Sequence, residues 1–197
     1  MKKRFVLIVV LIIIISCGVA AYKIRNQKTP DLEIVEYVAC DAYDIRNLEQ
    51  LEELSDIIVK ATVLPGSENV PHIEGVRMGR TYTDVKVQTV YKGDVSTGDI
   101  INITELYYYE NDGAELASFN GYLPSNIGSE YVLFLGNSED ESNNRHYLIG
   151  AERGRYSQEA IYGVKNRTFS TDHYTFLEDT EVYRHLRKEV LDKYYRD

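Results

Sequence analysis

The chain has 197 residues, of which 44% are hydrophobic, so it is long enough to build a folded core and is not disordered as a whole. It contains 31 Asp and Glu against 22 Lys and Arg, which gives a formal net charge of −9. A chain this acidic repels phosphate backbones, and this argues against nucleic acid as a partner.

The N-terminus is typical of an export signal or a membrane anchor. A basic start (MKKR) precedes the uncharged run FVLIVVLIIIISCGVAA, which ends at residue 21. Because basic residues stay in the cytoplasm, we expect the rest of the chain outside the cell membrane, facing the extracellular side. The sequence therefore divides into a signal peptide or membrane anchor at 1–21, a polar tether at 22–31, and a single extracellular domain at 32–197.

The two cysteines leave the mode of attachment open. Ile14-Ile15-Ser16-Cys17 resembles the lipobox of bacterial lipoproteins, which implies lipidation of Cys17. The apolar run continues past Cys17 and just reaches the lower limit for a spanning helix, so an uncleaved single-span anchor is an alternative, and secretion after cleavage is a third. Cys40 alone cannot form a disulfide within the domain, and we interpret it as a small buried hydrophobe or a free thiol.

The domain is predicted to begin with a short helix that runs into a strand. The leucines of 44–54 have helical spacing, and Asn47 and Gln50 are arranged as in a capping box. In the segment 57–64 (IIVKATVL), alternate apolar residues share one face, which indicates a strand ended by Pro65 and Gly66. The region from Gly66 to Gly79 has the composition of a loop.

Further strands follow from alternation and from apolar runs. Residues 82–92 (YTDVKVQTVYK) place Val85, Val87, Thr89 and Tyr91 on one side, and a connection of hairpin length leads to a strand over 100–109 (IINITELYYY). The run 131–135 (YVLFL) is apolar on both faces and is predicted to be central. Residues 146–150 follow a polar loop, and 155–164 alternate enough for a last hairpin.

The C-terminal segment 179–195 has the pattern of an amphipathic helix. Its apolar residues recur at intervals of four, with two more beside them: Val182, Leu186, Val190 and Tyr194, then Tyr183 and Leu191. We expect this helix to pack on the domain. The fold class predicted from these elements is mainly β: a small antiparallel barrel with a short N-terminal helix and a C-terminal amphipathic helix.

The order of four segments resembles a known group of barrels. The segments are ELSDIIVKATV, YTDVKVQTVYKGDVSTGDII, IGSEYVLFL and YLIGAERGRY, with Gly93, Gly98 and Gly128 at the turns, and the resemblance covers about 55–156. They are similar to the OB-type barrel of the tissue-inhibitor-of-metalloproteinase and netrin group, which implies an OB-like barrel here. The animal members carry several disulfides, and their cysteine-rich N-terminal edge has no counterpart except Cys40, so the resemblance does not extend to protease inhibition.

Motifs for catalysis and cofactors are missing from the sequence. None of His72, His146, His173 and His185 has the close spacing of a metal motif, and no phosphate loop, dinucleotide fingerprint or nucleophile elbow is present. The polar stretches 110–113 and 138–144 lack the regular ligand alternation of a calcium loop, and we interpret them as solvated tips. We expect neither a metal nor another cofactor.

The tyrosines are the unusual feature of the composition, with 17 Tyr against 5 Phe and no Trp. In a strand, Tyr107 and Tyr109 share one face and Tyr108 points to the other. An aromatic face on an OB-type sheet stacks on a sugar ring or holds a peptide, so these three tyrosines are the candidate binding residues. The alternative is that they fill the barrel, since tyrosine is a good strand former.

The function predicted from these features is that of a non-enzymatic, membrane-tethered extracellular domain that binds an envelope protein or a glycan. One alternative is a purely structural module of the cell envelope. Another is an envelope hydrolase whose site brings an Asp or Glu together with a histidine in space.

Overall fold

In the computed structural model, residues 33–37, 45–72, 78–119, 121–138, 145–158 and 181–196 are described, and all belong to a unit that spans Leu32–Asp197. The predicted anchor and tether, with Cys17, and also Cys40 and His173, lie outside these residues, as does the last predicted hairpin beyond residue 158. No helix within the described ranges has the length and apolar character needed to cross a membrane.

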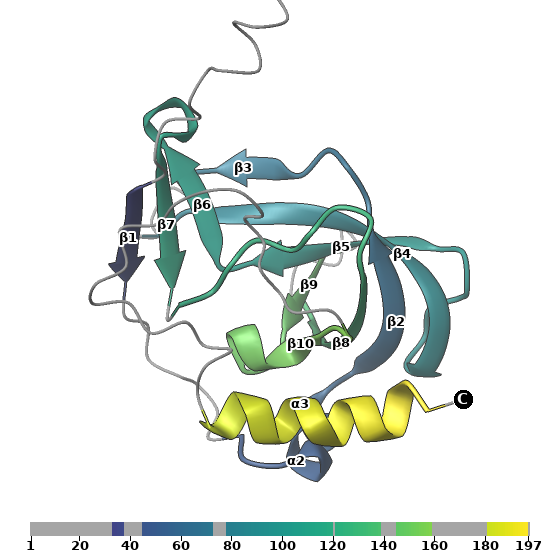
Figure 1. The fold of residues 1–197 in the computed structure, drawn as a ribbon. Helices are drawn as coiled ribbons and strands as arrows, with labels where there is room; N and C mark the ends of the chain where they lie inside the picture. The colour runs from purple at the N-terminus through teal and green to yellow at the C-terminus, as the bar shows by residue number, and fades with distance from the viewer. Residues whose placement is uncertain are drawn as a thin grey trace, which may run out of the picture. The chain divides into compact units, whose positions relative to one another are not determined.

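Five strands form a closed β-barrel, and the fold is mainly β (Figure 1). They are β2 (Ile57–Val63), β4 (Arg80–Lys92), β5 (Ile100–Glu105), β8 (Glu130–Asn137) and β9 (Arg145–Leu148). The order around the barrel is β8-β2-β4-β5-β9, and β9 pairs again with β8. Two short strands extend this sheet: β3 (Glu68–Val70) on β4, within the segment predicted as a loop, and β10 (Arg155–Tyr156) on β8.

The barrel predicted as antiparallel contains one parallel pairing. The pairing of β5 with β9 is parallel, with Asn102 opposite Arg145 and Thr104 opposite Tyr147. The other four pairings around the barrel are antiparallel. The reason is geometric: strand direction can alternate all the way around a ring only if the number of strands is even, so a ring of five needs at least one parallel pair.

The strand predicted over 100–109 is two strands that belong to different sheets. β5 ends at Glu105, and after Leu106 the chain continues as β6 (Tyr107–Glu110), which forms a hairpin with β7 (Glu115–Phe119) through the 3-10 turn Asn111–Gly113. β1 (Glu33–Tyr37) adds to β7 in parallel, so this sheet has the order β1-β7-β6. β9 faces β5 only as far as Thr104, and β7 pairs with all of β6.

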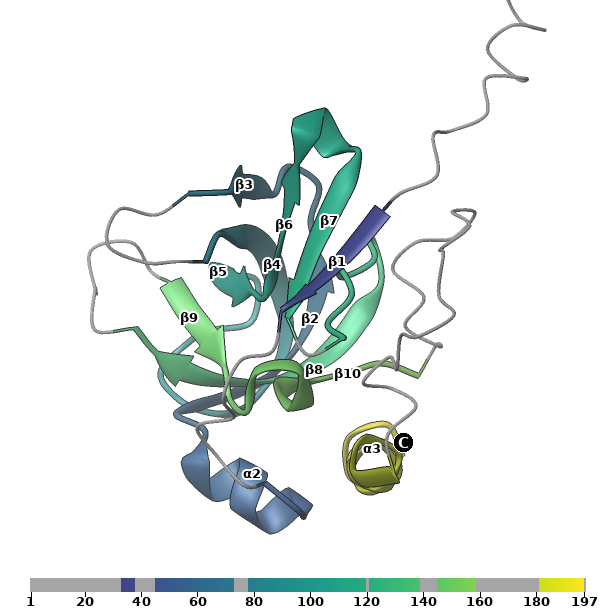
Figure 2. The same ribbon diagram turned by 90° about the vertical axis from the view of Figure 1, so that its left-hand side faces the viewer.

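Two helices lie next to each other at one end of the barrel (Figures 1 and 2). α2 (Leu48–Leu54) starts after Asn47, whose side-chain oxygen accepts a hydrogen bond from the backbone N of Gln50 at 2.9 Å. The predicted C-terminal helix is present as α3 (Glu181–Tyr194). Its buried face differs from the predicted one by one residue, because Tyr183 is buried and Val182 is 38% exposed.

The core confirms the faces predicted from alternation. On β2, the residues Ile57, Val59, Ala61 and Val63 are all buried. On β4, Val85 and Val87 are fully buried, whereas Thr89 and Tyr91 on the same predicted face are exposed. β8 is buried on both faces from Tyr131 to Gly136. Gly93, in the turn after β4, has φ +99° and lies where a Cβ would be 2.7 Å from the backbone oxygen of Asp56, so glycine is required there.

Phe134 provides the sharpest test of this packing. It has no exposed surface and meets the rings of Tyr156 and Tyr194 edge-on, at centroid distances of 6.0 and 5.7 Å. Phe134→Ala should lower the free energy of unfolding by about 3–5 kcal/mol, because it removes a buried ring and leaves a cavity. Urea denaturation measures the loss. Ile100→Ala, at a residue that is 55% exposed, is the control, and an equal loss in both variants would contradict the packing described here.

Candidate functional site

The inner face of the barrel changes from apolar to polar along two adjacent strands. On β4, Val87 and Val85 are followed toward the N-terminal end by buried Thr83 and Thr81. On β5, buried Ile101 and Ile103 are followed by Glu105, which shares their face and is 1% exposed. Because β4 and β5 are antiparallel, these polar ends lie together at one mouth of the barrel. Thr81 is opposite Glu105 in the strand register, and Thr83 is opposite Ile103.

Glu105 is held by a dense set of hydrogen bonds. Its Oε1 accepts from the Tyr122 hydroxyl at 2.9 Å, from the backbone N of Ser125 at 3.0 Å and from the Ser125 hydroxyl at 2.5 Å. Its Oε2 accepts from the hydroxyl of Thr83. These donors satisfy a carboxylate that is almost completely shielded from water, at 1% exposure.

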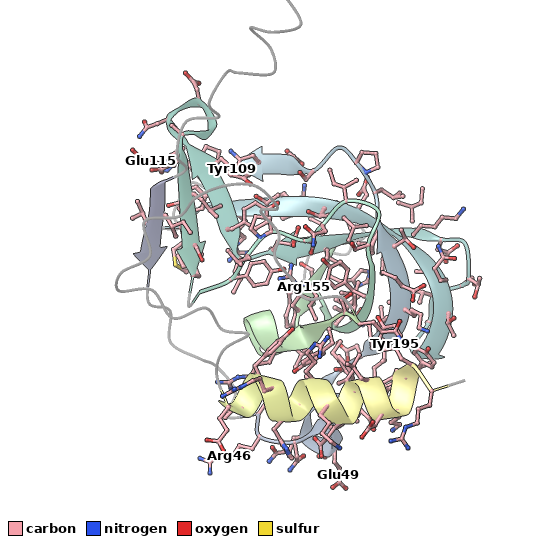
Figure 3. The ribbon with its side chains drawn as sticks, in the orientation of Figure 1. Arg46, Glu49, Tyr109, Glu115, Arg155 and Tyr195 are labelled. Carbon is pink, nitrogen blue, oxygen red and sulfur yellow. The ribbon has the colours of Figure 1, made fainter. Side chains whose placement is uncertain are left out.

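Arg155 supplies the charge that balances Glu105. Its Nη1 lies 3.0 Å from Oε1 of Glu105, and both side chains are almost completely buried, at 2% and 1% exposure. The guanidinium also donates to the hydroxyl of Ser125 at 2.6 Å and to the backbone oxygen of Leu123 at 2.8 Å. Its centre lies 4.2 Å from the centroid of the Tyr122 ring, so the cation is also over an aromatic face. Figure 3 shows Arg155 in the interior of the domain.

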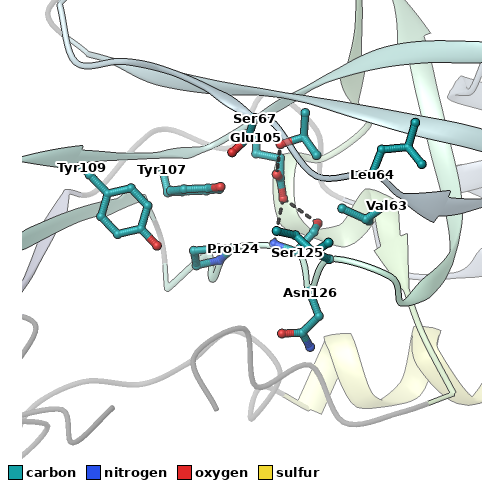
Figure 4. A pocket seen from close by; sticks show the side chains of 11 residues that line it. Val63, Leu64, Ser67, Glu105, Tyr107, Tyr109, Pro124, Ser125 and Asn126 are labelled. Atoms are coloured by element: carbon teal, nitrogen blue, oxygen red, sulfur yellow. Dashed lines mark hydrogen bonds between the residues drawn. The ribbon is translucent and has the colours of Figure 1, made fainter. Parts of the chain in front are cut away.

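A pocket of about 250 Å³ opens above this network (Figure 4). Its floor contains Glu105, and its walls come from the end of β2, from β4, from β6 and from the segment before β8. The lining residues are Val63, Leu64, Ser67, Thr83, Glu105, Tyr107, Tyr109, Pro124, Ser125, Asn126 and Ile127. Of these, Ile127 is the most exposed apolar side chain, at 67%.

The structure separates the three candidate tyrosines. Tyr107 and Tyr109 line the pocket, and their rings meet edge-on at a centroid distance of 5.6 Å. Tyr107 is buried, whereas Tyr109 is half-buried. Tyr108 points to the other face of β6, where it packs with Phe119 in a small separate cluster. Two of the three residues therefore belong to one pocket, and the third has a place in the packing.

The backbone of Tyr109, which forms one wall of the pocket, is held by hydrogen bonds to a side chain. The amide of Asn69, on β3, donates to the backbone oxygen of Tyr109 at 2.8 Å and accepts from its backbone N at 2.7 Å. Tyr107, also on β6, is held from β4: its backbone oxygen accepts a hydrogen bond from the Thr81 hydroxyl at 2.8 Å. The wall of the pocket is thus tied to β3 and to β4.

The electrostatics of the pocket favour neutral tyrosines. Burial raises the pKa of Tyr107, and the nearby Glu105 carboxylate raises it further. Burial also raises the pKa of Tyr122, although the Arg155 guanidinium opposes this shift. Both hydroxyls therefore stay protonated at physiological pH.

The histidines that the structure describes are dispersed. His72 is exposed in the segment after β3, and His185 is on α3 with Nε2 3.7 Å from Glu189. His146 is on β9 and is 8% exposed, and neither ring nitrogen has a hydrogen-bond partner within the described part of the chain. In the same part, no group of three His, Cys, Asp or Glu side chains is arranged to hold a metal ion.

Glu105 and Arg155 are not among the residues selected from the sequence. A signal for Glu105 is present, because the alternation of β5 puts it on the same face as Ile101 and Ile103, and a carboxylate on a core-facing position needs a partner. Nothing local in the sequence identifies Arg155 as that partner, since 50 residues separate the two.

Comparison with known proteins gives no family: no family model matches the chain, and no significant match is found among curated proteins.

The buried ion pair generates a direct test. Arg155→Met leaves the Glu105 carboxylate buried without its cation, and we expect the free energy of unfolding to fall by about 3–5 kcal/mol. Adding Glu105→Gln removes the uncompensated charge and should restore part of the loss. Both are measured by urea denaturation, with Arg145→Met as the control, because Arg145 is at the surface and 3.5 Å from Glu68. An Arg155→Met variant no less stable than Arg145→Met would be incompatible with the assigned pair.

The burial of His146 leads us to expect that the stability of the fold depends on pH. Burial lowers the pKa of His146 below its ordinary value of 6.5, although the Asp56 carboxylate opposes the shift. The unfolded chain then binds a proton more readily than the folded one, so stability is full above about pH 7 and falls as the pH drops through 6.5. Thermal melting of the wild type and of His146→Phe between about pH 7 and pH 5 measures this difference. If both lose stability equally over that range, another group is responsible.

Proposed function

We propose that this chain is a membrane-tethered extracellular domain that binds a protein or another component of the cell envelope without catalysing a reaction. The observation that carries the proposal is the pocket at the mouth of the barrel, where Tyr107 and Tyr109 form an aromatic wall and exposed Ile127 forms part of the rim. A preformed concave site with a few placed polar groups is the usual form of a binding site.

The topology supports the OB-like part of the proposal. The barrel has five strands, and the third and fifth in chain order, β5 and β9, are parallel, which is consistent with an OB-type barrel. OB-folds bind ligands on the face of their second and third strands and the adjacent loops. Here the connection between the first two barrel strands, β2 and β4, supplies Leu64 and Ser67 to the pocket lining.

The state of Glu105 favours binding over catalysis. A general base needs a free lone pair directed at the proton that it removes. Glu105 instead accepts hydrogen bonds from Tyr122, Ser125 and Thr83 and pairs with Arg155. To act on a substrate it would have to give up these bonds, whereas as a fixed floor it positions the residues around it.

The membrane location in this proposal rests on the sequence. The basic start and the apolar run of residues 1–21 support a position of the domain outside the cell, with attachment either through a lipid on Cys17 or through a single span. The domain would then meet envelope proteins and glycans, which are the partners proposed here.

Site-specific photocrosslinking tests the proposal. A benzophenone amino acid replaces Ile127 at the pocket rim or, as a matched control, Ile100, which is also an exposed isoleucine but does not line the pocket. Irradiation of intact cells that make the full chain should give a discrete adduct from position 127 and none from position 100. Equal adducts from the two positions, or none from position 127, would count against the pocket as the binding surface and in favour of a structural module.

A further inference from the structure

The pocket has a chemistry that restricts what it accepts. We infer that it holds one neutral pyranose ring of a glycan, stacked on Tyr109; this rests on the proposed function and names the ligand class for the same pocket. The argument has four parts: charge, polarity, size and preorganisation.

Charge excludes ionic ligands. The lining residues contain no Lys, Arg or His, so an anionic group would face the Glu105 carboxylate with no cation on the pocket surface. A cationic group gains little, because Arg155 already neutralises Glu105 at 3.0 Å and the hydroxyls of Tyr122, Ser125 and Thr83 occupy its oxygens. A ligand without net charge is the one that avoids both costs.

Polarity excludes a purely aliphatic ligand. One part of the lining is apolar (Val63, Leu64, Pro124 and Ile127), but Ser67 and Asn126, whose side chains carry hydrogen-bonding groups, are also lining residues. Within the described residues, neither of these two side chains has a hydrogen-bond partner. An aliphatic side chain seated here would remove them from water without replacing those bonds, which is unfavourable. A sugar ring has an apolar face for the aromatic wall and hydroxyls for Ser67 and Asn126.

Size limits the occupant to one ring. The volume of about 250 Å³ is below the roughly 300–1,000 Å³ of pockets that hold drug-sized ligands. The site therefore suits a single unit of a chain that continues outside the pocket, past Ile127, which is 67% exposed.

Preorganisation supplies the stacking surface. The ring of Tyr109 is half-buried and stands edge-on to Tyr107, with an interplanar angle of 79°. Its backbone is fixed by two hydrogen bonds to the Asn69 amide, at 2.8 and 2.7 Å. An aromatic wall that is already in position loses little conformational entropy on binding.

Saturation-transfer difference NMR on the full chain in detergent micelles tests the inference. The probes are methyl glycosides on one ring framework that differ in charge: neutral glucoside and N-acetylglucosaminide, cationic glucosaminide and anionic glucuronide. Acetylated leucine and phenylalanine amides represent neutral peptide side chains. We expect millimolar or tighter binding of at least one neutral glycoside and at least about tenfold weaker binding of both charged ones.

Two variants place the binding at the pocket. Tyr109→Ser removes the stacking wall and Asn126→Ala removes the amide, and each should weaken binding of the neutral glycoside about tenfold. Tyr147→Ser is the control for Tyr109→Ser, because Tyr147 is a 40% exposed tyrosine on β9 that does not line the pocket. Asn137→Ala is the control for Asn126→Ala. If Tyr109→Ser lowers the melting temperature strongly, the Asn126 pair of variants carries the test.

The outcomes separate this inference from the proposed function. Binding of the charged glycosides as tight as that of the neutral ones, no binding of any neutral glycoside, or neutral binding that neither pocket variant weakens would overturn the inference. Peptide amides that bind in the pocket instead would also overturn it, while the proposed function would stand. Failure of crosslinking at position 127 together with pocket-specific glycoside binding would leave the inference standing and would count against a protein partner at this pocket.

Discussion

Glu105 and Arg155 meet at a point where three segments of the chain converge without sharing a strand pairing. Glu105 ends β5, Arg155 begins β10, and Leu123 and Ser125 belong to the connection between β7 and β8. Burying both charges costs several kcal/mol per ion unless the geometry satisfies them. The three segments must therefore be in place together, because the two charges are satisfied only when the segments pack correctly.

Arg155 and Glu105 also contact or form part of two other features, the helix α3 and the pocket. The hydroxyl of Tyr183, on α3, donates to the backbone oxygen of Arg155 at 2.9 Å, so the helix is fixed to the strand that carries the cation. On the opposite side, Glu105 and Ser125 form the floor of the pocket. The floor of the pocket is thus made by residues that the buried hydrogen-bond network holds in place.

Much of the barrel is predictable because its strands obey local rules. Alternation identifies the buried faces of β2 and β4, and the apolar run of β8 indicates its central place. The break at Leu106 is not predictable in this way, since 100–109 is a continuous β-forming stretch and only pairing with β7 turns it into two strands. The prediction that Val182 lies on the packed face of α3 is wrong for a related reason. A strict spacing of four residues drifts around a helix with 3.6 residues per turn, and the packed face includes Tyr183 in place of Val182.

The candidate site is predictable only in part. Residue alternation is sufficient to place Tyr107 and Tyr109 on one side of β6 and Tyr108 on the other, and the structure has this arrangement. It does not indicate that Asn69 holds the Tyr109 backbone, or that Arg155 balances Glu105, because both contacts join residues 40 or more positions apart. Side-chain contacts at this separation depend on the completed barrel, and no periodic pattern in the sequence indicates them.

The parallel seam between β5 and β9 has a consequence for the route by which the chain folds. β2 pairs with β4, and β4 with β5, so these three strands can assemble as an antiparallel meander from neighbouring parts of the chain. Ring closure instead joins Asn102–Thr104 to Arg145–Tyr147, and β6, β7 and β8 lie between them in sequence. Contacts of such long range carry a large loop-closure entropy and slow the approach to the native state. The barrel should therefore close late, after an open, curved sheet has formed, and until then the edges of β5 and β9 are exposed to pairing with other chains.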